Sequence, residues 1–399
     1  MRSITSSVMG GITEVNERLH YNAPCPRPVD LRPRLTVAKQ RDILFSNSRP
    51  PPMRFAELPL AAQTAYAELA EQARTLELTN ALAGLVGSFH KLERKSQHYW
   101  YFAFRDLDGK VRMSYVGPDD DRVRALVKRF KETRKPKALE PQARAAIALG
   151  CAPTAPKHFR IIKRLADHGF FRAGGVLVGT HAFIAMGNLL GVRWGDGSAT
   201  LDVDFAHAGR NVSVALPADL RMDVHGALES LEIGLLPITR FDGKAGAQYR
   251  NPNDPELRLD FVTGGTRGGR PVVLEDLNLA LEPLKFMEFS LEATTQGCLL
   301  GRTGACTVNV PSPARYAVHK LVVFGERPQS ERTKARKDLL QAACLADYHA
   351  RSGEADAFNA AWRDAAGRGR GWKSRAIEGK KALLRIAPEL DLRELWALT

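Results

Sequence analysis

Apolar residues recur at helical spacing in several segments, and each of these segments predicts one or two helices. They span residues 55–82, 119–132, 138–149, 157–169, 181–190 and 353–399. Shorter patterns predict strands. Residues 86–116 combine an aromatic run, the turn signal Asp108-Gly109 and a second, alternating run, so we expect a β-hairpin or three-stranded meander. Val176–Val178 predicts a short strand that ends in a Gly179-Thr180 turn.

Two aspartates interrupt an otherwise apolar, strand-like run at residues 200–206, which reads TLDVDFA. Because strand side chains alternate between two faces, Asp202 and Asp204 share one face and Val203 packs on the other. Taken alone, such a pair more often marks an exposed strand face or a loop. A third carboxylate, Asp260, lies in a similar run, LRLDFV, and is expected on a neighbouring strand beside the pair.

Three converging carboxylates would repel one another strongly without a metal ion. Carboxylate oxygens suit Mg²⁺ or Mn²⁺, which bind a few protein carboxylates together with substrate phosphates. Two such ions activate an attacking oxygen and stabilise a leaving pyrophosphate. The Gly179-Thr180 turn adds backbone N–H groups and a small hydroxyl at a helix N-terminus, where phosphate binds readily. The ordered set therefore favours chemistry over an exposed strand face.

Composition indicates a globular protein of two to three domains, because the 399 residues are 44% hydrophobic and 26% charged. No stretch has the roughly 20 apolar residues of a membrane span, and the N-terminus lacks an apolar core of signal-peptide length. The five cysteines are scattered and odd in number, so we expect a reducing cytoplasm. We expect buried thiols at Cys298 and Cys306, not a zinc site.

The formal charge of +14 indicates a polyanionic partner. Between residues 84 and 137, fourteen Lys and Arg face seven Asp and Glu, and the same segment carries the aromatic run. It is our candidate nucleic-acid platform, although the aromatics could equally form a small core beneath a solvated basic face. Residues 361–386 carry eight basic and two acidic residues, which could close a groove over a polyanion or form a solvated bundle face.

The order Gly-Thr, Asp-x-Asp and single strand Asp resembles the DNA polymerase β-type nucleotidyltransferase superfamily. The sequence is most similar to its bacterial abortive-infection and toxin enzymes, through Gly179-Thr180, Thr200–Phe205 and a helical Lys…Lys-Asp block in residues 310–345. This resemblance implies an α+β fold with a polymerase β-type core, in which a small mixed sheet is flanked by helices. A basic β-hairpin and helical module would precede this core, and a C-terminal helical bundle would follow it.

The resemblance also implies roles for individual residues. Asp202, Asp204 and Asp260 would hold the metal ions, and Gly179 and Thr180 would cradle the β- and γ-phosphates. The remaining residues carried over are Lys320 and, more weakly, Arg327 and Lys334 as phosphate contacts, and Asp338 as a base or orienting group. From the residues alone, Lys320 reads as a solvated helix face and Asp338 as a charge near the start of a helix that Lys337-Asp338 opens.

Two features depart from the family pattern. Val178 and His181 flank the Gly-Thr pair where the toxin enzymes often have Gly and Ala. The Gly-rich insert TGGTRGGRP at residues 263–271 follows Asp260 directly. Its Arg267 and Arg270 could form a lid over a triphosphate, or the insert could be a flexible hairpin.

We therefore expect four segments: a leader at 1–54, a basic module at 55–152, a catalytic core at 153–310 and a helical domain at 311–399. The expected activity is metal-dependent transfer of a nucleotide from an NTP to an acceptor hydroxyl, with RNA, such as a tRNA 3′ end, as acceptor. A toxin or phage-defence role follows from the resemblance alone. Alternatives are transfer to a protein or small molecule, glycosyl transfer, and nucleic-acid binding by an inactive transferase fold.

Overall fold

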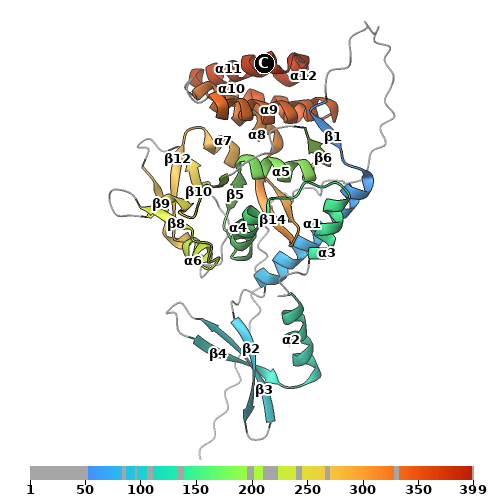
Figure 1. Cartoon of the computed structure of the whole chain (residues 1–399), viewed down its shortest axis with the longest axis vertical. Helices are drawn as coiled ribbons and strands as arrows, with labels where there is room; N and C mark the ends of the chain where they lie inside the picture. Colours follow the sequence, from blue (N-terminus) through green and yellow to red (C-terminus); the bar gives the residue numbers. More distant parts are fainter. Residues whose placement is uncertain are drawn as a thin grey trace, which may run out of the picture. The chain divides into compact units, whose positions relative to one another are not determined.

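The computed structural model describes ten stretches of the chain (Figure 1). They are residues 53–82, 87–94, 97–105, 111–133, 139–195, 202–209, 223–239, 245–265, 270–327 and 332–397. The chain divides into two compact units, 1–50 and 51–399, and the described residues all belong to the second. All but the last two residues of the expected leader, 1–54, lie outside the described stretches.

A mixed seven-stranded sheet forms the centre of the second unit. Its strands are β5 (Gly175–Val178), β7 (Asp202–His207), β8 (Leu236–Thr239), β9 (Ala245–Asn251), β10 (Asp254–Gly264), β11 (Val272–Leu274) and β12 (Leu279–Leu284). They run in the order β11-β12-β10-β7-β5, and β9 pairs with both β8 and β10. Strands β7 and β12 are parallel to β10, and the other pairs are antiparallel.

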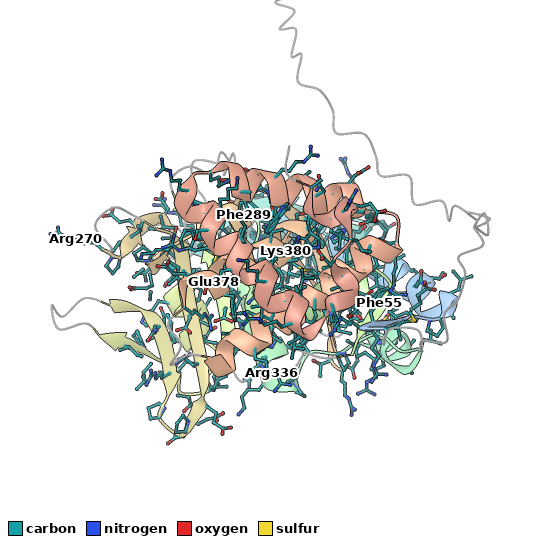
Figure 2. The ribbon with its side chains drawn as sticks, turned by 90° about the horizontal axis from the view of Figure 1, so that it is seen from above. Phe55, Arg270, Phe289, Arg336, Glu378 and Lys380 are labelled. Atoms are coloured by element: carbon teal, nitrogen blue, oxygen red, sulfur yellow. The ribbon has the colours of Figure 1, made fainter. Side chains whose placement is uncertain are left out.

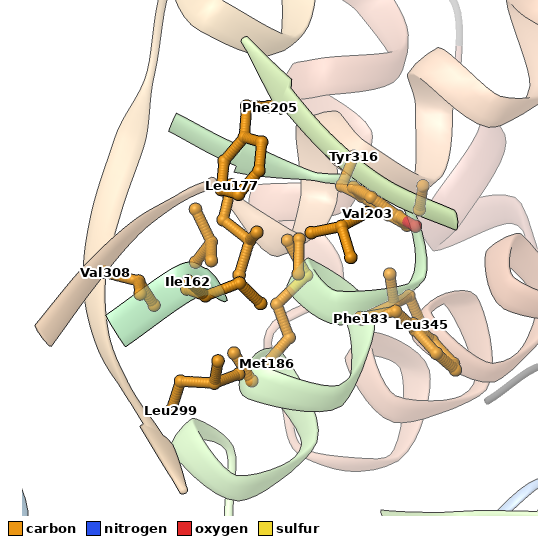
Figure 3. Packing of buried hydrophobic residues seen from close by; sticks show 14 of the residues in the cluster. Ile162, Leu177, Phe183, Met186, Val203, Phe205, Leu299, Val308, Tyr316 and Leu345 are labelled. Carbon is orange, nitrogen blue, oxygen red and sulfur yellow. The ribbon is translucent and has the colours of Figure 1, made fainter. Parts of the chain in front are cut away.

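One face of β7 packs on the core while the other carries the aspartates. Val203 and Phe205 are fully buried, and the ring of Phe205 stacks on that of Phe261 in β10 at 5.1 Å. Figure 3 shows both β7 residues packed with Leu177 of β5 and with residues of helix α5 (Gly179–Leu189). Burying one such aromatic ring contributes roughly 2–3 kcal/mol, so the apolar face fixes the strand register.

Further helices pack on the strands of this sheet or on one another. They are α4 (Pro156–Asp167), α6 (Val224–Glu229), α7 (Met287–Leu291), α8 (Pro313–Glu326), α9 (Arg332–Arg351), α10 (Ala355–Gly367), α11 (Arg370–Ile386) and α12 (Arg393–Trp396), with short 3₁₀ segments at Glu275–Leu277 and Pro388–Leu390. The expected C-terminal helices are confirmed, and Glu378 and Lys380 mark α11 in Figure 2. The expectation that Lys337-Asp338 opens a helix is wrong: α9 begins at Arg332, so both residues lie in its second turn.

A second hydrophobic cluster joins elements that are distant in sequence. Helices α1 (Leu60–Leu82) and α3 (Glu140–Ala148) pack on the hairpin of β13 (Thr294–Gly301) and β14 (Gly304–Pro311). Strand β1 (Phe55–Glu57) pairs with β6 (Val192–Trp194). The main cluster likewise joins the sheet to α8–α11. The expected boundaries at 153 and 311 therefore each fall inside a packed cluster.

The segment between α1 and α3 forms a small sheet and a helix. Strands β2 (Gly87–Arg94), β3 (Gln97–Arg105) and β4 (Val111–Pro118) form a three-stranded antiparallel meander, followed by α2 (Asp121–Thr133). The predicted meander is confirmed. The four described cysteines, including Cys298 and Cys306, are buried free thiols, as expected. Among the described helices, none combines the length and apolarity that spanning a membrane requires.

Candidate active site

The three predicted carboxylates lie on two neighbouring strands. Strand β10 runs parallel to β7 in a register that sets Asp260 opposite Asp204 and Arg258 opposite Asp202. Since side chains two residues apart share a strand face, all four polar side chains project from the same face. The pairing thus brings together carboxylates from distant parts of the chain, in the arrangement expected for Asp260.

Arg258 lies between two of these carboxylates. Its Nη2 is 3.3 Å from Oδ2 of Asp202, and its Nε is 3.2 Å from Oδ2 of Asp260. Within the described stretches, no three His, Cys, Asp or Glu side chains are arranged to hold a metal ion. In this structure the guanidinium supplies the positive charge that the carboxylates require. Sequence reasoning missed Arg258, although its place two residues before Asp260 puts both on one strand face.

The surroundings of Asp204 disfavour its negative charge. Burial, reinforced by the negative charge of Asp260, raises the pKa of Asp204 from 3.8 to about 6, and the charge of Lys320 opposes this rise. Gly179 lies directly against the carboxylate: it has φ of +62°, and a Cβ there would lie 2.0 Å from Oδ2 of Asp204. Only glycine permits both this conformation and this approach.

Gly179 also opens α5, directly after β5. The first backbone N–H groups of a helix have no partner within it, so they face outward as anion donors. Thr180, the next residue, is buried, and its Oγ1 accepts a hydrogen bond from Nε2 of Gln341 at 3.3 Å. The Tyr316 hydroxyl lies 2.8 Å from the Gly179 carbonyl oxygen and 2.8 Å from Oε1 of Gln341. Helices α8 and α9 thus hold the turn in place.

Lys320 and Asp338 form a buried ion pair between α8 and α9. Nζ of Lys320 is 2.7 Å from Oδ1 of Asp338, and Nη2 of Arg327 is 3.0 Å from the other carboxylate oxygen. Burial alone would lower the pKa of Lys320, but the Asp338 carboxylate outweighs it and holds that pKa above its ordinary value. Both oxygens of Asp338 therefore face cations, which suits an orienting group and not a base.

Lys337 is a further cation that sequence reasoning left without a role. Burial and the charge of Lys320 lower its pKa, and its ammonium interacts electrostatically with Asp204 and Asp202. The side chain of Lys334 lies outside the described part of the structure, as does Arg267 of the Gly-rich insert.

Comparison with known proteins gives the family. Residues 157–367, more than half of the chain, match the family described as Nucleotidyltransferase. A solved structure, an antigenic nucleotidyltransferase-like protein from Paracoccidioides brasiliensis, is 15% identical with a TM-score of 0.35, over 62% of this chain and 97% of that one. No curated protein matches the sequence. The matched region contains both carboxylate strands, α5, α8 and α9. The chain therefore belongs to the nucleotidyltransferase family and is a transferase that uses an NTP.

Proposed function

We propose that the chain is a polymerase β-type enzyme that transfers a nucleotide from an NTP to an acceptor hydroxyl and depends on Mg²⁺ or Mn²⁺. The observation that carries this proposal is the in-register pairing of Asp204 with Asp260, with Asp202 one pleat away and Gly179 against Asp204. Acidic oxygens on adjacent strands fit a hard divalent cation in type and number. Burial and the negative charge of Asp260 raise the pKa of Asp204, and a cation bound beside it would oppose both effects.

Asp202, Asp204 and Asp260 would hold the cation. When bound, it lowers the pKa of the acceptor hydroxyl and stabilises charge on the leaving pyrophosphate. Because Arg258 pairs with Asp202 and Asp260, its guanidinium must swing away before these oxygens can serve as ligands. With the guanidinium displaced, the oxygens of Asp202 and Asp260 would lie beside Asp204 without their cation, which would favour a metal ion there.

The other residues would bind the triphosphate. The N-terminus of α5 at Gly179 receives the β- and γ-phosphates, and Lys320 and Lys337 contribute positive charge from α8 and α9. Asp338 orients Lys320 through their 2.7 Å ion pair. The acceptor oxygen bonds to the α-phosphorus as its proton passes to the Asp260 carboxylate. The bond between the α-phosphorus and the bridging oxygen breaks, and pyrophosphate leaves with both electrons.

RNA is the proposed acceptor. Residues 84–137 carry fourteen basic and seven acidic residues, a charge balance that suits a phosphate backbone. A role as a toxin or in phage defence follows from the sequence resemblance. It predicts that expressing the wild-type chain slows cell growth and that expressing Asp202→Asn with Asp204→Asn does not.

The deciding experiment supplies purified protein and Mg²⁺ with each α-phosphate-labelled NTP and a cell extract. We expect labelled RNA, which vanishes on RNase treatment, and no labelling by Asp202→Asn with Asp204→Asn. Label in protein or in a small molecule would refute the RNA acceptor. Absence of any label, with equal cellular behaviour of wild type and double variant, would refute the transferase assignment.

One observation favours a second candidate, a nucleic-acid-binding protein with an inactive transferase fold. Arg258 already neutralises two of the three carboxylates, as a structural ion-pair network would. This candidate predicts that removing both Asp202 and Asp204 leaves nucleic-acid binding and any cellular effect intact. Loss of the cellular effect by a variant that still folds would exclude it.

A further inference from the structure

The meander β2-β3-β4 has two unlike faces. On one face, Nε1 of Trp100 donates to Oδ1 of Asp119 at 2.8 Å, and Lys91 pairs with the same carboxylate at 2.6 Å. Phe102 on this face is buried, as are Val123 and Val127 of α2. This face therefore forms the small core that the sequence pattern left open as an alternative.

The opposite face carries the large apolar side chains that the described part of the meander exposes: Leu92, Val111, Met113 and Tyr115. The strand register explains this arrangement, because Tyr115 lies opposite Tyr101, Met113 opposite Ala103, and Leu92 opposite Tyr99. Tyr115 is 56% exposed and Met113 45%, so these side chains reach solvent. The sequence left two alternatives for the aromatic residues, a small core or an exposed binding surface. In the structure, one face of the sheet is packed and the other exposes its aromatic side chains.

Three tyrosines and an arginine form the centre of this face. The ring of Tyr115 lies 6.0 Å from that of Tyr99 and 5.6 Å from that of Tyr101. The guanidinium carbon of Arg94 lies 5.5 Å from the centroid of the Tyr101 ring. Among the described residues that the register assigns to this face, none is acidic. Such a surface offers π-faces and positive charge without like-charge repulsion of a phosphate backbone.

We propose that this tyrosine face, formed by Leu92, Arg94, Tyr99, Tyr101, Met113 and Tyr115, binds single-stranded RNA. Unpaired bases stack on exposed aromatic rings and on arginine planes, whereas the bases of a duplex are already stacked on one another. The surplus of seven basic residues in 84–137 attracts the backbone. A protein partner would also cover apolar side chains, but it does not account for the missing carboxylates or for the arginine over Tyr101. The inference extends the proposed function, because an RNA acceptor must be held while its end is modified.

The test measures binding of the full chain to a short fluorescent single-stranded RNA by anisotropy. Tyr115→Ala is expected to weaken binding roughly fivefold to 100-fold, since one stacked base contributes about that much. Tyr115→Phe keeps the ring and is expected to bind within about twofold of wild type. Met113→Glu places a negative charge beside the rings and is expected to weaken binding, most strongly at low salt. Leu236→Ala, an equally exposed apolar position on β8, is the matched control and is expected to bind normally.

Circular dichroism and thermal melts confirm that each variant folds. Unchanged binding by Tyr115→Ala, equal losses for single-stranded and duplex RNA, or tighter binding of single-stranded DNA would each overturn the proposal. A wild-type dimer that Tyr115→Ala converts to a monomer would assign the face to a second copy instead. The Asp202→Asn, Asp204→Asn protein is expected to bind RNA normally. Failure of RNA binding is therefore distinguishable from failure of nucleotidyl transfer.

Discussion

Replacing Gly179 by alanine tests whether the close approach of the α5 turn to Asp204 organises the site. A left-handed conformation costs a residue with a side chain about 1–2 kcal/mol. The new Cβ would lie 2.0 Å from Oδ2 of Asp204, well inside van der Waals contact, so the carboxylate or the turn must shift. An off-rotamer aspartate adds roughly 0.5–1.5 kcal/mol. We therefore expect Gly179→Ala to lower the free energy of unfolding by about 2–3 kcal/mol. The transfer rate should fall roughly 100-fold, because a displacement near 1 Å misplaces the reacting groups.

Gly353→Ala is the matched control for this substitution. Gly353 has a similar φ of +78°, but no atom lies within 4 Å of its would-be Cβ. Urea denaturation of Gly353→Ala should therefore show the conformational cost alone, about 1–2 kcal/mol, with the transfer rate unchanged. The reasoning fails if the two variants are equally destabilised and equally active, since the approach to Asp204 would then have no consequence.

Further substitutions, at Asp204, Arg258, Lys320 and Asp338, probe the charges of the site. The pKa of Asp204 in the folded protein is raised from 3.8 to about 6, so between these values the native state keeps a proton that the unfolded state has lost. The free energy of unfolding should therefore fall as the pH rises from about 4 to about 6. Urea melts of Asp204→Asn across this range should lack that fall. Arg258→Met should tighten Mn²⁺ binding roughly tenfold in electron paramagnetic resonance titrations, because the metal ion no longer has to displace the guanidinium from Asp202 and Asp260. Breaking these two partly exposed ion pairs costs about 1.4 kcal/mol in the wild type. Weaker binding by the variant would instead mean that Arg258 holds the carboxylates in place for the metal ion. Lys320→Met should lower the free energy of unfolding in urea melts by about 3 kcal/mol, because it leaves Asp338 buried without this partner. The double variant Lys320→Met with Asp338→Asn should lose less than the sum of the two single changes. Additive losses would contradict a coupled buried pair.

Local patterns predicted the strand faces well, for a physical reason. Alternation in TLDVDFA and LRLDFV decides which side chains face the core, whichever strands become neighbours. The strand period placed Asp202 and Asp204 on one face, and the ordered set with Gly179-Thr180 and Asp260 made all three candidates for a site. The same alternation places Arg258 on the strand face of Asp260. It was missed because only acidic residues were considered as candidates on that face. The meander was likewise predictable, because its turn signal and alternating run are local.

Contacts between helices could not be predicted in this way. Gln341 reaches Thr180, and Tyr316 reaches Gly179, across 161 and 137 residues respectively, and no local pattern encodes such meetings. The burial of Thr180 involves such a contact, because Gln341 of α9 donates to its hydroxyl oxygen. Nor does a local pattern reveal that the hydroxyl oxygen of Tyr66 in α1 accepts from the backbone N–H of Cys298, 232 residues away, at 3.0 Å.

The parallel pairing of β7 with β10 has a consequence for the order of events during synthesis. Parallel neighbours need a long crossover, and here the paired Asp202 and Arg258 are 56 residues apart. The entropic cost of closing this loop therefore has to be met before strand pairing contributes any stabilising free energy. A nascent chain that has exposed only TLDVDFA carries two aspartates and no site. On the proposed function, nucleotidyl transfer would begin only after β10 has left the ribosome, so shorter nascent chains would be inactive.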